Sequence, residues 1–143
     1  MRLRQVHPSD LVLLLTGFAL FFLNDLVLKA LLSETAVGWL FKNHFNDVLA
    51  GLAFLAYTNV LISLFRPKWR FVRLAIIVPY IFACGLFWEY AAPLFVNDSV
   101  GDPWDLLAYV VGGLAYWAAN MLATRANAAG GGRDVNECAG GHA

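Results

Sequence analysis

Four long apolar runs constrain what this chain can fold into more than any other feature of its sequence. They extend over residues 11–32, 44–65, 74–96 and 104–124. A helix rises about 1.5 Å per residue, so about 20 apolar residues suffice to cross a bilayer. Only 14% of the residues are charged, too few to cover the surface of a soluble domain. The sequence therefore predicts an all-α polytopic membrane protein, with four transmembrane helices in an antiparallel bundle.

The rest of the composition indicates one domain and a short tail. Residues 1–125 form the predicted membrane domain. Residues 126–143 are small and polar, and they are predicted to be disordered because they offer little apolar area to bury. Cys84 and Cys138 are too few for a disulfide framework and are read as free thiols. The formal net charge is zero, so no overall field favours nucleic acid as a partner.

The basic residues predict the orientation of the bundle. Eight of the ten Lys and Arg residues lie at the start of the chain, between residues 66 and 73, or after residue 124. In a chain with four spans these three segments share one side of the membrane. Basic residues accumulate on the cytoplasmic side, so both termini are predicted to be cytoplasmic.

This orientation places most acidic residues of the apolar runs in one layer toward the outer side. Glu89 lies about 22 Å along the helix expected from residue 74. A carboxylate within an apolar run needs a partner, a water-filled cavity or a function. The residues predicted to accompany Glu89 in an outer pocket are His44, Asp47, Asp105, Asp25, Lys42 and Tyr109.

Residue spacing indicates which side chains face into the bundle. His44 and Asp47 are three residues apart and share a helix face, which Gly51 continues. Asp105 and Gly112 likewise share a face. Glycine permits helices to approach closely, so both faces are predicted to point inward.

Simpler structural roles stay open for several of these residues. Asp102 is followed by proline, which is typical of a helix N-cap with proline at the first helical position. Asp105 would then lie in the first turn, where the helix dipole favours a negative charge. Glu89 can pair with Lys42 or His44 and serve only to hold helices together.

At these positions the chain resembles the VanZ-like family of small bacterial membrane proteins. The matching residues are Lys42 and His44 in FKNHF, Glu89 in WEY, and Asp105 with Gly112 in DLLAYVVG. The resemblance covers residues 42–113. It implies a multi-pass protein of the bacterial inner membrane, associated with the cell envelope and, in the founding case, with glycopeptide resistance.

The chain departs from the family pattern at three points. Ala92 stands where the family has Gln, and Tyr109 stands where it has Asn. No Arg precedes Asp105 in the turn. The resemblance therefore describes a divergent member or a sister family.

Three functions are compatible with this pattern. The first is a non-enzymatic envelope protein that binds a membrane lipid, or a lipid-linked or glycopeptide ligand, in the outer pocket. The second is an outer-leaflet enzyme using acid/base or metal-assisted chemistry, and the third is a small transporter or proton relay. The sequence shows no recognised metal-ligand spacing or nucleophile motif, so no metal, cofactor or catalytic residue is assigned. Homo-oligomer formation is left open.

Overall fold

Within the described residues, the protein consists of helices joined by short links, without strands. The computed structural model describes residues 6–32, 34–35, 37–91, 94–95 and 102–139, and side chains as far as Ala126. Four helical segments in these ranges are long and apolar enough to cross a membrane: Pro8–Leu31, Phe45–Phe65, Leu74–Ala91 and Pro103–Ala126. The predicted all-α fold with four spans is confirmed. The predicted end of the third span, at residue 96, lies outside the described residues.

Two of the spans change helix type partway. The elements in chain order are α1 (Pro8–Leu23), the π-helix η2 (Asn24–Leu28), α2 (Lys29–Leu31), α3 (Gly38–Asn43), α4 (Phe45–Phe65), α5 (Leu74–Leu86), the π-helix η3 (Phe87–Ala91) and α6 (Pro103–Ala139). The π segments directly continue α1 and α5, so the side chains in and beyond each π segment are rotated relative to those of the α-helix before it. Short π segments inside α-helices frequently occur at functional sites.

Local sequence explains how α6 begins. The side chain of Asp102 accepts a hydrogen bond from the Trp104 N–H at 2.9 Å, and Pro103 is the first helical residue. Proline suits this position because its missing N–H would have no partner within the helix. The predicted N-cap is confirmed, and it fixes Asp105 in the first turn of α6.

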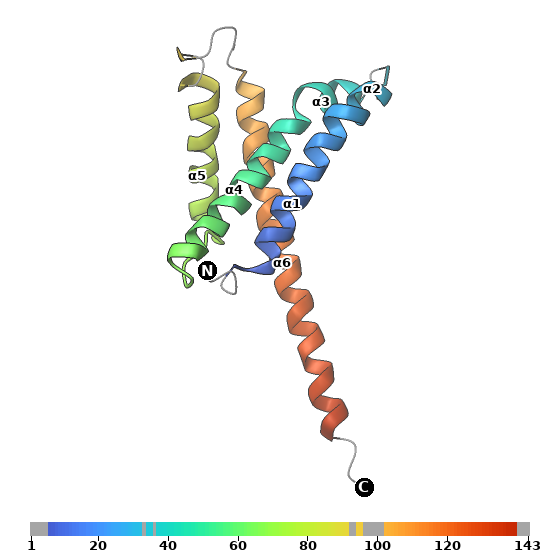
Figure 1. The fold of residues 1–143 in the computed structure, drawn as a ribbon, viewed down its shortest axis with the longest axis vertical. Helices are drawn as coiled ribbons and strands as arrows, with labels where there is room; N and C mark the ends of the chain where they lie inside the picture. The colour runs from blue at the N-terminus through green and yellow to red at the C-terminus, as the bar shows by residue number, and fades with distance from the viewer. Residues whose placement is uncertain (1–5, 33, 36, 92–93, 96–101, 140–143) are drawn as a thin grey trace.

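The helices α4 and α6 form the centre of the bundle. α1 packs mainly on α4 and α5 mainly on α6, which places the helices in the order α1, α4, α6, α5. Figure 1 shows the four long helices alternating in direction. At the α4–α6 crossing, a Cβ on Gly51 would collide with the Tyr109 carbonyl oxygen, and one on Gly112 would collide with that of Val48. The predicted close approach at these two glycines is confirmed.

The bundle has a narrow core and a large apolar exterior. Its buried core cluster comprises Leu55, Ala56, Ile77, Ile81, Tyr109 and Tyr116. Large apolar side chains such as Phe18, Phe22 and Phe87 are exposed on the outside of the bundle. A monomeric soluble protein rarely exposes so much contiguous apolar surface, whereas a lipid environment requires it. The exposed apolar faces therefore agree with the membrane assignment.

α6 is longer than the sequence indicated. The prediction placed a disordered tail from residue 126, whereas the helix continues to Ala139. An established helix extends at low cost because its nucleus has already formed, although Gly130, Gly131 and Gly132 disfavour the extension. In Figure 1 this last part of α6 projects beyond the other helices.

Candidate functional site

Three polar side chains meet where α4 and α6 begin. His44 directly precedes α4, Asp47 lies in the first turn of α4, and Asp105 lies in the first turn of α6. Both carboxylates gain from the positive end of a helix dipole. We call His44, Asp47 and Asp105 the His–Asp cluster.

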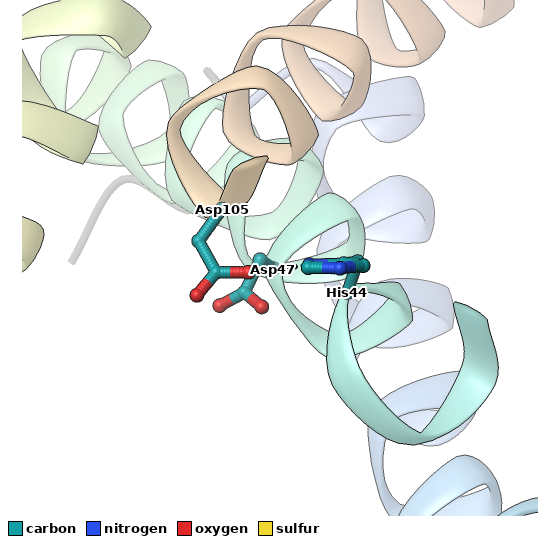
Figure 2. A group of neighbouring side chains, drawn as sticks. All are labelled: His44, Asp47 and Asp105. Atoms are coloured by element: carbon teal, nitrogen blue, oxygen red, sulfur yellow. Dashed lines mark hydrogen bonds and ion pairs between the residues drawn. The ribbon is translucent and has the colours of Figure 1, made fainter. Parts of the chain in front are cut away.

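The members of the His–Asp cluster are within bonding reach of one another. The Nδ1 atom of His44 lies 2.6 Å from Oδ1 of Asp105. Each of the three residues offers one ligand atom, and these atoms all lie within 4.8 Å of each other. Figure 2 shows the imidazole of His44 and the two carboxylates pointing toward a common centre. The sequence had placed these three residues in one pocket, and the structure brings them together.

Burial of His44 distinguishes it from an ordinary surface histidine. Its side chain is only 8% exposed, and the ring of Trp39 packs edge-on against it with centroids 4.7 Å apart. Among the described residues its Nε2 atom has no hydrogen-bond partner. A buried polar atom without a partner costs about 1–3 kcal/mol, so this nitrogen needs an explanation.

Glu89 borders the cluster without joining it. It lies in η3 and accepts a hydrogen bond from the backbone N–H of Asp102 at 3.1 Å, which ties the third span to the start of α6. Its charge nevertheless acts on Asp47 and on Tyr109. Glu89 was the predicted centre of the pocket, whereas the shortest contacts centre on His44 and Asp105.

The other predicted pocket residues divide into two groups. Tyr109 is buried one turn below Asp105 and interacts electrostatically with the acidic residues of the site. Asp25 is not a member of the cluster, because its carboxylate binds Lys29 at 2.7 Å on the next turn and interacts with the Asn46 side chain. Lys42 is exposed and forms no ion pair with the described residues, so it does not neutralise Glu89.

Asn24 was not assigned a role in the sequence interpretation, yet it joins the first span to the region of the cluster. It is fully buried in η2 and donates to the Phe41 carbonyl oxygen at 2.9 Å and to Oδ1 of Asn46 at 2.8 Å. The signal that could have found it is an amide within an apolar run, next to Asp25.

A second polar network lies at the opposite end of the bundle. Asp10 is fully buried and accepts hydrogen bonds from Nε and Nη2 of Arg70, at 2.9 and 2.6 Å. The Tyr116 hydroxyl donates to the same carboxylate, and Asn59 donates to that hydroxyl at 2.6 Å. We call Asp10, Arg70, Tyr116 and Asn59 the Asp10 network. It joins α1, the α4–α5 link, α4 and α6.

The electrostatics of Arg70 fit a permanent structural pair. Burial alone would lower the pKa of its guanidinium, but the hydrogen bonds and the charge of Asp10 outweigh that effect and raise the pKa above its ordinary value. The guanidinium of Arg70 is therefore charged at any physiological pH. Asn59 also accepts from the Phe71 N–H at 2.7 Å and so fixes the link. The sequence interpretation used Arg70 only as a marker of orientation.

The fold and these two sites define the class of protein: a four-span helical membrane protein with a His–Asp cluster near one end and a buried Asp–Arg network near the other. Comparisons with protein-family models, with curated proteins and with solved structures gave no match to this chain. The resemblance to the VanZ-like family therefore stays a prediction from the sequence alone.

Proposed function

We propose that this chain is a VanZ-like protein of the bacterial inner membrane that binds the head group of a lipid or lipid-linked molecule. The observation that carries the proposal is the meeting of His44, Asp47 and Asp105, with Glu89 beside them, inside an apolar bundle. Ionisable residues within membrane spans are rare and mark functional sites by default. The polar head group of a lipid is a ligand that can reach such a cluster from the bilayer.

The orientation of the bundle is part of the proposal. The start of α1, the α4–α5 link and the C-terminal half of α6 lie at one end of the bundle in Figure 1. These segments hold most of the basic residues, so the positive-inside rule makes that end cytoplasmic. The His–Asp cluster would then face the outer leaflet.

An apolar groove between α4 and the third span favours a lipid as the ligand. The groove has a volume of about 250 Å³ and is lined mainly by Phe54, Tyr80, Cys84, Phe87 and Trp88, from α4 and from the third span. Its last two lining residues directly precede Glu89 in sequence. An acyl or prenyl chain in this groove would place its head group near the acidic residues.

A membrane enzyme is the second candidate, and one specific observation favours it. Three titratable side chains within 4.8 Å can support acid/base or metal-assisted chemistry. A transporter or proton relay is less well supported, because Leu55 and Ala56 of the buried apolar core lie between Asp47 and Asn59 along α4.

Binding of defined lipids to the full chain in detergent tests the proposal. Phosphatidylethanolamine, phosphatidylglycerol and a polyprenyl phosphate would each be titrated, with thermal stability as the readout. At least one should stabilise the wild type, and Asp105→Asn should weaken that effect. Asp25→Asn is the matched control, because Asp25 is an acidic residue engaged with Lys29 away from the cluster. Equal responses of all three proteins would argue against a head-group site here.

Reporter fusions test the orientation separately. A reporter after residue 126 should be active only in the cytoplasm, and one inserted within residues 97–101 only outside it. The opposite pattern would place the His–Asp cluster on the cytoplasmic side and exclude an outer-leaflet ligand.

A further inference from the structure

We propose that the His–Asp cluster binds one divalent transition-metal cation of the Zn²⁺ or Mn²⁺ type. The cluster supplies one imidazole and two carboxylates, and their ligand atoms lie within 4.8 Å of one another. These residues come from two different helices that are held together at the Gly51–Gly112 crossing. The site is therefore built by the fold rather than by a local sequence motif, and the sequence shows no metal-ligand spacing for this reason.

The balance of charge around the cluster calls for a cation. Asp47 and Asp105 lie together, and the charge of Glu89 also acts on Asp47. Among the described residues, the ion pairs of Lys29 and Arg70 are made with Asp25 and Asp10 respectively.

Within the described part of the chain, the one ion pair made by a carboxylate of the cluster joins Asp105 to His44. Lys42, which precedes α4, is exposed and pairs with none of the carboxylates. Uncompensated carboxylates in a membrane span are costly, and a divalent cation removes that cost.

The environment of His44 is the second and independent observation. Its imidazole points toward the two carboxylates (Figure 2), the residue is 6% exposed, and Nε2 has no hydrogen-bond partner among the described residues. Nδ1 lies 2.6 Å from Oδ1 of Asp105, so a cation held by both atoms would replace the proton that they share. The ring proton would then be carried by Nε2, which is the tautomer that a metal on Nδ1 requires.

The mixture of donors selects the type of ion. Mg²⁺ and Ca²⁺ prefer oxygen ligands alone, whereas imidazole suits Zn²⁺ and related metals, and carboxylates suit Mn²⁺. Three protein ligands leave at least one coordination position open. This further point rests on the proposed function. An acidic cluster alone repels a phosphate head group, whereas a bound cation attracts one, so the cation would explain how an acidic site binds such a head group.

Metal binding by the purified full chain tests this inference. The protein would be stripped with a chelator and titrated with Zn²⁺ alone and Mn²⁺ alone, and metal content would be measured by mass spectrometry after dialysis. The wild type should retain about one ion per chain. Asp47→Asn and Asp105→Asn should each bind at least about tenfold more weakly. Asp25→Asn should bind as the wild type does, since Asp25 lies outside the cluster.

The outcomes separate this inference from the proposed function. A wild type that binds neither ion, or variants that bind as tightly as the wild type, would overturn the metal site whatever the lipid assay shows. If the wild type binds metal but no tested lipid, the metal site stands and the head-group proposal fails. Lipid binding that persists unchanged in the presence of a chelator would show that lipid binding does not depend on the metal. The wild-type measurement needs no substitution, so misfolding of a variant cannot explain a failure of the wild type to bind metal.

Discussion

Substitution of Gly112 tests the packing that brings the site together. A Cβ at this position would collide with the Val48 carbonyl oxygen and would lie 2.8 Å from the Leu52 amide nitrogen. Both atoms belong to the backbone of α4 and can move only if the whole helix moves. We therefore expect an overpacking cost near the upper end of the usual range, about 3 kcal/mol, against a gain in helix propensity of about 1 kcal/mol. Gly112→Ala should lose about 2 kcal/mol of stability.

The neighbouring glycine provides the matched control. A Cβ on Gly113 would meet only side-chain atoms, Cγ1 of Ile81 at 3.1 Å and Cγ2 of Ile77 at 3.4 Å. These can shift by a few tenths of an ångström, so Gly113→Ala should change stability by less than about 1 kcal/mol. Unfolding in detergent, followed by circular dichroism, would measure both variants. If Gly112→Ala proved as stable as Gly113→Ala, the close α4–α6 crossing would be refuted.

Two further substitutions test the polar residues at each end of the bundle. Asp10→Asn leaves the charge of Arg70 without its partner and should lower the free energy of unfolding by about 3 kcal/mol. The control Ser63→Ala removes only a hydrogen bond within α4 and should cost under about 1 kcal/mol. Equal unfolding transitions of the two variants would contradict this prediction. Glu89→Gln keeps an acceptor for the Asp102 N–H, so its thermal stability should match the wild type while lipid binding falls about tenfold or more. Unchanged lipid binding by Glu89→Gln and Glu89→Ala alike would remove Glu89 from the site.

The parts of this fold that follow from local physics could be predicted from the sequence. The four spans follow from apolar length, and the N-cap at Asp102 follows from an acidic residue before proline. The meeting of His44 and Asp47 follows from their spacing on one helix. Asp105 could be added because a four-span topology brings the starts of the second and fourth spans to the same side.

Other features depend on tertiary contacts that no local pattern records. The Asp10–Arg70 pair joins residues 60 positions apart, and Arg70 lies in a link whose shape the sequence does not specify. Asp10 directly precedes the first apolar run, so the argument applied to Glu89, that a carboxylate in an apolar run needs a partner, did not extend to it. The π segments were also missed. The apolar runs are apolar on nearly all sides, so one extra residue in a turn leaves no mark on the hydrophobic pattern, although it rotates Glu89 relative to α5.

The energetics of the α4–α6 pair connect the crossing to the cluster. Two carboxylates within 4.8 Å of each other, if both are charged, repel each other by at least about 3 kcal/mol at an effective dielectric constant near 20. Gly51 and Gly112 hold the helices in contact close to Asp47 and Asp105, so helix packing must offset this repulsion when no cation is bound. A bound cation reverses the sign of that interaction and adds to the packing. The same crossing that positions the ligands therefore makes the stability of the bundle depend on what the cluster holds.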